Sequence, residues 1–411
     1  MRPDPSGGSR VGRWGRSALA GATIEIDSLA PPQQYRQRRR RPRSLGLSRW
    51  RVSVAKKEWT VMVYMAADNS ENEYMLADLS IDASSDLYEM MTVGSQPHAD
   101  VVVQVDWKKP KGAERIHILP NGWEQLQHAP EPINVGAPAQ LEDFVGWAQK
   151  RFPAKHYFLI LWGHSFRYAF GFDGGDALSF KELSDVLGKH NVDILGFDSC
   201  GMSAIESAYQ LRRSVDLMLA SEIGMPLQGW PYDRILQALT RDMSPQDLGQ
   251  AVVREFVTSY PDKTIALTLL NLKVAGSLLS PMQALASSLD DAVQGDDGQR
   301  EEIFGLFRDA AVPKGEPMVD LRALCRNLTV LDVDKRVREA ADALNAALAE
   351  GKGFVVVHGR RGAEAEGLGG VSAYAPHVGM SRDDWLDTYD DLDLSRNTTW
   401  RAVIRSLALG F

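Results

Sequence analysis

The chain has 411 residues, of which 44% are hydrophobic and 24% are charged, and its formal net charge at pH 7 is −8. This is the composition of an ordinary globular protein, and the acidic charge does not favour nucleic-acid binding, which needs clustered Lys and Arg. The two cysteines exclude a disulfide scaffold and a zinc site built mainly on thiolates, and the apolar runs are too short to span a bilayer.

Residues 1–57 differ in composition from the rest of the chain. They are rich in Arg, Pro, Gly and Ser, include the basic run of residues 36–43, and lack the sustained period of a helix or strand. We expect this basic segment to be disordered, with the Arg run either a solvated tail or an arm for anionic partners. Its apolar part is too short for a secretory signal and the two thiols suit a reducing compartment, so we expect a cytoplasmic protein and leave secretion open.

From residue 58 to the C-terminus, predicted strands and helices alternate. Apolar and β-branched runs predict strands at residues 59–67, 101–107, 115–119, 156–164, 192–197, 217–221, 264–272, 353–358 and 370–375. Apolar residues at helical spacing predict helices at residues 72–91, 141–150, 180–187 and 202–213, and residues 294–298 read as a solvent loop. This order predicts one α/β domain, residues 58–411, with a mostly parallel sheet flanked by helices on both faces and a C-terminal extension of the same sheet.

Two reactive side chains stand at the ends of predicted strands. His164 ends the strand of residues 156–164, and Cys200 follows the strand of residues 192–197. One right-handed crossover would bring both to the same edge of the sheet, where catalytic groups of parallel α/β proteins lie. An imidazole beside a thiol takes its proton during attack and returns a proton to the leaving amine. The alternative is a buried, inert cysteine and a surface histidine.

The residues around the pair fit the same chemistry. Cys200 precedes the predicted helix of residues 202–213, whose N-terminus would lower the pKa of the thiol. Backbone N–H groups near Cys200 and at Gly163 and His164 are candidates for holding a tetrahedral oxyanion. Gly163 and Gly201 permit the backbone turns that such a site requires.

Seven stretches of the chain occur in the order of one known family. They are WTVMVYMAADNSENEYMLADL (59–79), LILWGHS (159–165), FDSCGMSAIESAYQLR (197–212), SEIGMPLQGWPY (221–232), MVDLRAL (318–324), GLGGVSAYAP (367–376) and LDLSRNTTWRAVI (392–404). Together they resemble the clostripain family of caspase-like cysteine peptidases. The resemblance implies a caspase-like three-layer αβα fold, endopeptidase activity on protein or peptide substrates, and a dyad of His164 and Cys200 without an obligatory third member.

The resemblance also implies substrate contacts. The family has an acidic residue two places before the nucleophile that lines the specificity pocket, and Asp198 stands there. A buried carboxylate at this place would bind Arg or Lys on the acyl side of the scissile bond, whereas the alternative is a helix cap or loop carboxylate. Trp230 and Tyr232 belong either to an aromatic pocket wall or to the core. Glu222 is a candidate contact for the substrate backbone or amine.

Two positions depart from the family pattern. Ser165 follows the histidine where the family commonly has glycine, and Gln228 stands where relatives often carry another acid. These departures motivate an alternative function, that of a catalytically inactive caspase-like binding or scaffold protein. An amidase or transpeptidase using the same dyad is a third alternative.

No cofactor or metal is expected from the residues themselves. Some relatives are activated by calcium and by cleavage of their own chain. Asp173 and Asp176 offer carboxylates near the active edge and lack the ligand series of a recognised calcium loop, so a calcium site stays the alternative to having no metal. The basic residues 36–43 and 212–213 are candidate points of self-cleavage.

Overall fold

The structure is a computed structural model that describes residues 56–68, 78–108, 111–129, 131, 133–166, 169–173, 175–295, 297–310, 312, 317–376 and 389–409. The disorder predicted for residues 1–57 therefore falls outside the described residues, apart from the last two. The first part of the helix predicted at residues 72–91 and the candidate cleavage point at residues 36–43 also fall outside them.

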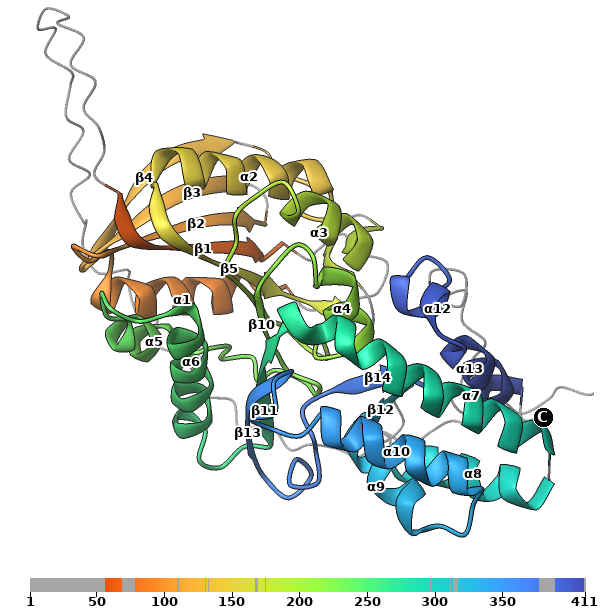
Figure 1. Cartoon of the computed structure of the whole chain (residues 1–411). Coiled ribbons are helices and arrows are strands. Elements are labelled where there is room, and N and C mark those ends of the chain that lie inside the picture. The colour runs from red at the N-terminus through yellow and green to blue at the C-terminus, as the bar shows by residue number, and fades with distance from the viewer. Residues whose placement is uncertain are drawn as a thin grey trace, which may run out of the picture. The chain divides into compact units, whose positions relative to one another are not determined.

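The main sheet is mixed, with a parallel centre. Its strands are β1 (Lys57–Ala66), β2 (Ala99–Trp107), β3 (Gly112–Leu119), β4 (Gly122–Ala129), β5 (Ala154–Gly163), β9 (Ile194–Asp198), β10 (Leu217–Ala220), β11 (Ile265–Asn271) and β13 (Val355–Arg361). Within the described residues these nine strands take the order β13-β11-β10-β9-β5-β1-β2-β3-β4 (Figure 1). The run from β2 to β10 is parallel, and antiparallel pairs add β3 and β4 at one edge and β11 and β13 at the other. The predicted mostly parallel α/β sheet is confirmed.

The central strands are buried on both faces because their apolar runs are nearly continuous. In β1, Met62 and Tyr64 join one hydrophobic core, while Val61 and Val63 join the core on the opposite face of the sheet. Successive side chains of a strand point to opposite faces, so such a run supplies both cores at once.

Helices cover both faces of the sheet, as expected. On one face lie α1 (Ser80–Val93), α5 (Tyr232–Ala238) and α6 (Pro245–Ser259), and on the other lie α2 (Pro138–Arg151), α3 (Phe180–Leu187), α4 (Ile205–Leu211) and α7 (Leu279–Gly295) (Figure 1). The core that contains Met62 and Tyr64 extends into the 3-10 helix η1 (Leu272–Leu278) and the C-terminal helices. These are α8 (Asp297–Asp309), α9 (Leu321–Val330), α10 (Lys335–Ala347), α12 (Asp393–Asn397) and α13 (Trp400–Leu409). The described residues, from 56 to 409, form one compact unit.

Several local predictions need correction. The last predicted strand is β14 (Ser372–Tyr374), which pairs with β12 (Met318–Asp320) in a separate two-stranded sheet, so only β13 extends the main sheet. The loop expected at residues 294–298 is occupied at both ends by helix, because α7 continues to Gly295 and α8 begins at Asp297. The hairpin strands β6 (Ser165–Phe166), β7 (Ala169–Asp173) and β8 (Asp176–Ser179), just after the histidine, were not predicted.

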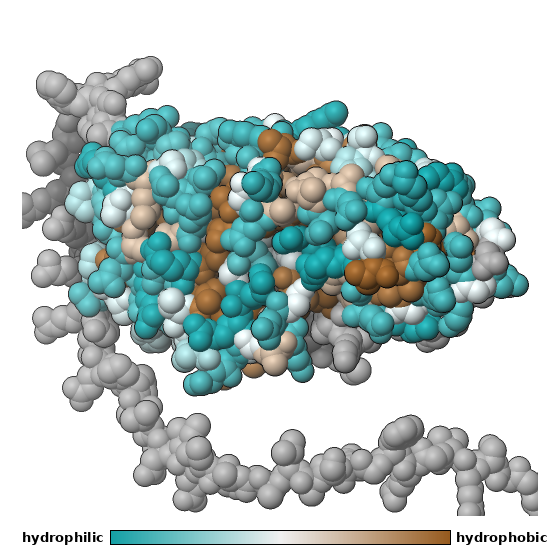
Figure 2. Space-filling view, turned by 60° about the horizontal axis from the view of Figure 1, so that its bottom comes forward, coloured by the Kyte–Doolittle hydropathy of each residue, from teal (hydrophilic) through white to brown (hydrophobic). Residues whose placement is uncertain are grey.

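Large apolar side chains are sparse on the surface. Hydrophilic residues cover most of the face drawn in Figure 2, and apolar residues gather there in small patches. Ile81 and Tyr88 of α1 and Leu227 are among the exposed large hydrophobic residues. Within the described residues, no helix combines the length and the hydropathy that crossing a bilayer demands.

Candidate active site

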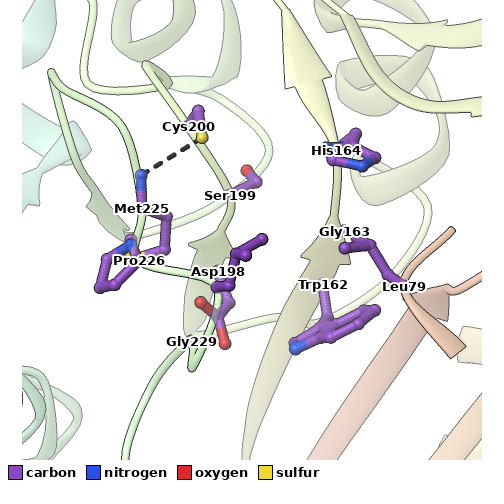
Figure 3. A pocket seen from close by; sticks show the side chains of 11 residues that line it. Leu79, Trp162, Gly163, His164, Asp198, Ser199, Cys200, Met225, Pro226 and Gly229 are labelled. Carbon is purple, nitrogen blue, oxygen red and sulfur yellow. Dashed lines mark hydrogen bonds between the residues drawn. The ribbon is translucent and has the colours of Figure 1, made fainter. Parts of the chain in front are cut away.

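His164 and Cys200 line one cleft at the carboxyl ends of two neighbouring strands. β5 and β9 pair in parallel, with Trp162 opposite Asp198, and each reactive residue follows within two positions of its strand's end. The cleft holds about 390 Å³, counting the part open to solvent. Figure 3 shows His164 on the β5 side and Cys200 on the β9 side. The two side chains that the sequence predicts to lie near each other therefore line the same cleft.

Cys200 is the accessible one of the two cysteines. Cys200 is partly exposed, whereas Cys325 is buried and has a pKa raised to about 12 by that burial. Burial also raises the pKa of the Cys200 thiol, and the charge of Asp198 acts in the same direction. The Met225 N–H, which donates to Sγ of Cys200 at 3.2 Å, lowers the pKa of the thiol but does not outweigh the burial.

The expectation that a helix N-terminus lowers the Cys200 pKa is wrong. Helix α4 begins at Ile205, three residues later than predicted, and has only seven residues. The residues between Cys200 and Ile205 instead form an irregular segment in which Ala204 makes an isolated bridge with Ser372. The helix dipole acts within about one turn of the helix end, so the thiol gains little from it.

Ser165, the departure from the family's glycine, ties the loop of His164 to the loop of Cys200. Its hydroxyl donates a hydrogen bond of 2.5 Å to the backbone carbonyl of Cys200. The carbonyl of His164 in turn accepts from the N–H of Gly171 on β7. The hairpin after the histidine therefore fixes the backbone of both reactive residues.

The two candidate oxyanion glycines differ in the structure. Both have positive φ, +140° at Gly163 and +63° at Gly201, and a Cβ atom at Gly163 would lie 2.9 Å from the carbonyl oxygen of Ala66. Gly163 lines the cleft, whereas the N–H of Gly201 donates to the carbonyl of Ile223 at 3.1 Å. Gly201 thus serves the turn after the cysteine, and its N–H reaches an oxyanion only if this bond breaks. The oxyanion role of Gly163 stays a prediction.

Asp198 lines the cleft as a buried carboxylate and does not cap a helix. Its Oδ2 accepts hydrogen bonds from the Trp230 N–H at 3.0 Å and from the Tyr232 hydroxyl at 2.9 Å. Its Oδ1 is buried and has no hydrogen-bond partner among the described residues. Burial raises the pKa of Asp198 above its usual range, because desolvation disfavours the charged form.

Trp230 belongs to the core, and its backbone N–H bonds the cleft residue Asp198. The indole is fully buried and packs on Phe158, with ring centroids 6.2 Å apart, and over Gly196. Tyr232 is also buried, with its hydroxyl on Asp198. Of the two alternatives for these aromatic residues, the structure favours the core. Gln228 accepts a hydrogen bond from the Lys263 ammonium.

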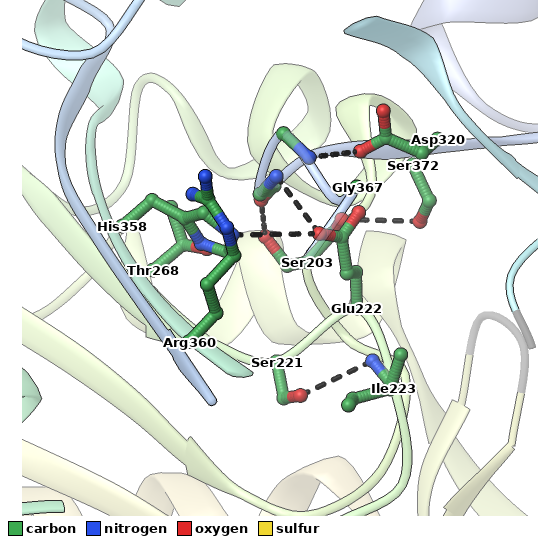
Figure 4. A network of polar contacts seen from close by, with 12 residues as sticks. Ser203, Ser221, Glu222, Ile223, Thr268, Asp320, His358, Arg360, Gly367 and Ser372 are labelled. Atoms are coloured by element: carbon green, nitrogen blue, oxygen red, sulfur yellow. Dashed lines mark hydrogen bonds and ion pairs between the residues drawn. The ribbon is translucent and has the colours of Figure 1, made fainter. Parts of the chain in front are cut away.

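Glu222 lies behind the cysteine loop (residues 199–204), within a buried polar network (Figure 4). Its side chain is fully buried, and Oε1 accepts from the N–H of Gly370 at 2.8 Å. Asp320 accepts from the N–H of Gly369 at 2.6 Å, and the Ser203 hydroxyl donates to the carbonyl of Gly370 at 2.6 Å. Burial and the neighbouring Asp320 hold the pKa of Glu222 well above its usual range. The structure therefore does not bring Glu222 to the cleft, where a substrate contact was expected, and gives it the role of supporting the cysteine loop.

The residues considered for calcium are engaged in loop contacts. Asp173 accepts from the Val135 N–H at 3.1 Å, and Asp176 accepts from the Asn134 side chain at 2.8 Å. Across the described residues, no group of three or more His, Cys, Asp or Glu side chains is arranged to hold a metal ion. The candidate cleavage point at residues 212–213 follows α4, and Arg212 pairs there with Asp393 at 2.8 Å.

One carboxylate near the cleft was missed in the sequence. Asp86 is buried on α1, and its Oδ2 accepts a hydrogen bond of 2.6 Å from the indole Nε1 of Trp162, a cleft residue. The signal was present, because Asp86 is the one acidic residue on a helix face otherwise made of Ala83, Leu87 and Met90. An acid among core positions of a predicted helix marks either a buried pair or a site.

Comparisons of the sequence relate this chain to known proteins. A sequence model of the clostripain family matches residues 63–406. Clostripain of Hathewaya histolytica is 26% identical over 219 residues, which are 44% of this chain and 42% of that protein, so the match spans less than half of that relative's length.

Two solved structures have a similar fold. One is an inactive zymogen of a C11 protease from Parabacteroides distasonis, at a TM-score of 0.64 and 17% identity, covering 84% of this chain and 98% of that one. The other is a secreted C11 cysteine protease from Bacteroides thetaiotaomicron in complex with an irreversible peptide inhibitor, at a TM-score of 0.61 and 18% identity, covering 84% and 99%.

Proposed function

Because the chain belongs to the clostripain family, we propose that it is a cysteine endopeptidase that cleaves after Arg or Lys, with Cys200 as nucleophile and His164 as general base and acid. The observation that carries the proposal is the shared cleft. Both side chains line it from the ends of the paired strands β5 and β9, and the buried carboxylate of Asp198 lines it too.

The raised pKa of Cys200 determines how the proton moves. At neutral pH the resting residue is a thiol, so His164 accepts the thiol proton as Sγ attacks the scissile carbonyl. The C–N bond then breaks, and His164 returns the proton to the departing amine, leaving an acyl thioester on Cys200. Attack of water, assisted by the same imidazole, releases the new carboxyl end. General acid–base help of this kind contributes roughly 10²–10⁴-fold to a rate.

The specificity rests on the surroundings of Asp198. Its Oδ1, which has no partner among the described residues, is an acceptor left for a cationic substrate group. Leu79, Met225 and Pro226 line the cleft with apolar surface. The methylene stem of Arg or Lys would pack on such a wall while its charged end reaches the carboxylate.

The inactive-scaffold alternative loses much of its motivation at the two departures. Ser165 bonds the backbone of Cys200 and so supports the nucleophile's position, and Gln228 faces Lys263. Neither departure removes a cleft-lining group. An amidase or transpeptidase would use the same dyad, and it differs only in the acceptor of the acyl group, so product analysis with added amines separates it from a hydrolase.

The test is hydrolysis of fluorogenic peptides with Arg, Lys or a neutral residue before the scissile bond. We expect wild-type protein to cleave the Arg and Lys peptides, and Cys200→Ala and His164→Ala each to lower kcat/KM by at least about 10³-fold. Cys325→Ala, which removes the other thiol, is the matched control and is expected to keep the activity. Equal turnover by wild type and Cys200→Ala would exclude the proposed nucleophile.

A lack of turnover by the wild type leads to a second measurement, the rate at which iodoacetamide alkylates each cysteine. Alkylation of Cys200 no faster than that of the buried Cys325 would establish the inactive scaffold. Accelerated alkylation of Cys200, with turnover appearing after limited proteolysis of the chain, would support the peptidase.

A further inference from the structure

We propose that Asp86 is a second specificity-determining carboxylate of the cleft, placed with Asp198 to bind the cationic side chain on the acyl side of the scissile bond. The inference deepens the proposed function and rests on it. It identifies a residue from a different element, α1, which lies more than 100 positions before Asp198 in the chain.

Gly229 shows how closely the two carboxylates approach each other. A Cβ atom on Gly229 would lie 2.8 Å from Oδ2 of Asp198 and 3.1 Å from Oδ2 of Asp86. The two oxygens are therefore no further apart than the sum of these distances. Gly229 and Asp198 line the cleft, and Asp86 lies against Gly229. Gly229 has a positive φ of +58° and no side chain, which leaves room for both carboxylates beside it.

The two carboxylates are buried, and no Lys, Arg or His among the described residues forms an ion pair with either. Asp86 is 2% exposed and Asp198 is 4% exposed. Within the described part of the chain, their hydrogen-bond donors are neutral: the Trp162 indole, the Trp230 backbone and the Tyr232 hydroxyl. Two carboxylates this close in a buried place resist carrying two negative charges unless a cation joins them. Burial accordingly raises the pKa of both, and the nearby charge of Asp198 raises the pKa of Asp86 further.

The neutral donors also hold the pair rigidly in place. Trp162 comes from β5, Trp230 precedes α5, and Tyr232 begins α5. Glu89, one turn after Asp86 on α1, accepts from the N–H of Tyr232 at 3.0 Å and so ties α1 to the same segment. A cation entering the cleft therefore meets two acceptors that are already positioned, which reduces the cost of ordering them.

The expected ligand is the guanidinium of Arg. Its five N–H donors form a planar fork that reaches two carboxylates at once, whereas the ammonium of Lys is a single compact charge. The pair formed by Asp86 and Asp198 therefore favours Arg over Lys. If Asp86 carries no charge, Asp198 alone is expected to discriminate less between Arg and Lys.

A purely structural role predicts something different. Asp86 would then serve only as the acceptor that orients the Trp162 indole. Asp86→Asn keeps an oxygen acceptor for that indole and removes only the negative charge. The substitution therefore separates recognition of a cation from positioning of Trp162.

The test is isothermal titration of a short acetylated peptide amide ending in Arg, and of its citrulline counterpart, into full-length Cys200→Ala protein at pH 8 and low salt. Citrulline has the shape of Arg without its charge. We expect Asp86→Asn to weaken Arg-peptide binding by at least about tenfold and to leave citrulline-peptide binding unchanged. Asp82→Asn, one turn earlier on the same helix, is the matched control and is expected to change either affinity by less than about twofold.

An unchanged Arg affinity in Asp86→Asn, or an equal loss for both peptides, would overturn the inference. Asp86→Glu, which keeps the charge, is expected to keep the discrimination between Arg and citrulline, and loss of that discrimination would count against the inference too. Hydrolysis by protein that retains Cys200 separates the two proposals. If Asp86→Asn protein cleaves Arg peptides and keeps the wild-type ratio of Arg to citrulline cleavage rates, only the role of Asp86 is overturned. If the wild type binds Arg peptides tightly but cleaves none of them, only the peptidase function is overturned.

Discussion

Asp198→Asn tests how the cleft recognises its substrate. The asparagine oxygen can accept the two hydrogen bonds that Oδ2 now accepts from Trp230 and Tyr232, so the fold is expected to persist. The amide nitrogen then stands where the unpartnered Oδ1 is now, and presents a donor to a substrate cation. Each charge-assisted hydrogen bond contributes about 1.5–3 kcal/mol, and every 1.4 kcal/mol is about tenfold. Loss of one such bond is expected to lower kcat/KM on an Arg peptide by roughly 10–10²-fold, and loss of two by roughly 10²–10⁴-fold.

The assay compares initial rates on paired peptides with Arg or citrulline before the scissile bond. We expect the citrulline peptide to be cleaved by Asp198→Asn as slowly as by the wild type, because that substrate has no charge to lose. An equal fall on both peptides would mean that Asp198 only supports the structure. A fall on the Arg peptide of less than about threefold would refute the reasoning altogether.

The pH dependence gives the same reasoning an independent readout. Because burial raises the pKa of Asp198, its negative charge develops only as pH rises above the usual range of a carboxylic acid. kcat/KM on Arg peptides is expected to rise over that range, and Asp198→Asn is expected to lose this limb of the profile. The stability of the fold is expected to fall with pH where kcat/KM rises. The protonated Asp198 stabilises the fold fully below its unfolded pKa, and this contribution is lost as pH rises through the raised folded pKa. Asp198→Asn is therefore expected to melt above the wild type at alkaline pH.

Three further variants test the supports of the site. Ser165→Gly removes the bond to the Cys200 carbonyl, so we expect about 1 kcal/mol less stability and a several-fold lower kcat with KM little changed; an unaltered kcat would show that the tether does not position the nucleophile. Because the pKa of Glu222 is raised in the fold, the wild type is expected to lose up to about 1.4 kcal/mol of unfolding free energy per pH unit above pH 4.5. Glu222→Gln is expected to lose less, as measured by urea denaturation. An identical pH slope in both proteins would contradict the raised pKa. Gly196→Ala places a methyl group 2.7 Å from the Trp230 ring and is expected to lower the unfolding free energy by about 1–3 kcal/mol, measured in the same way. An unchanged unfolding free energy would contradict the close packing of Trp230 on Gly196.

The sheet and the reactive pair were predictable because both depend on local patterns. Because a strand such as β5 is buried on both faces, its sequence is nearly continuous in apolar residues. The first polar residue after such a run is therefore easy to identify in the sequence. His164 and Cys200 follow the ends of two such strands, and the parallel connection between these strands fixes the edge at which the two residues lie.

The supporting groups were not predictable because their partners are distant in the sequence. Glu222 meets Gly370, 148 positions away, and Trp230 places its N–H on Asp198, 32 positions away. Periodicity reports which face of an element is apolar, but it does not tell which buried acid finds which backbone N–H. For this reason Glu222 read as a substrate contact, although it supports the cysteine loop.

Helix boundaries show the same limit on a smaller scale. The apolar spacing of residues 202–213 fits a helix throughout, yet α4 begins only at Ile205. Ser203 and Ala204 bond to the segment of residues 370–372 instead, and these tertiary bonds outweigh helix propensity. Asp86, by contrast, was readable, because a lone acid on the apolar face of a predicted helix needs an explanation.

The most direct test of the account is covalent labelling with a peptidyl-arginyl chloromethyl ketone followed by peptide mass mapping. We expect one adduct per chain, on Cys200 alone, formed at a rate that falls sharply in His164→Ala and in Asp198→Asn. An adduct on Cys325, or labelling of Cys200 at the same rate with and without the imidazole of His164, would contradict it.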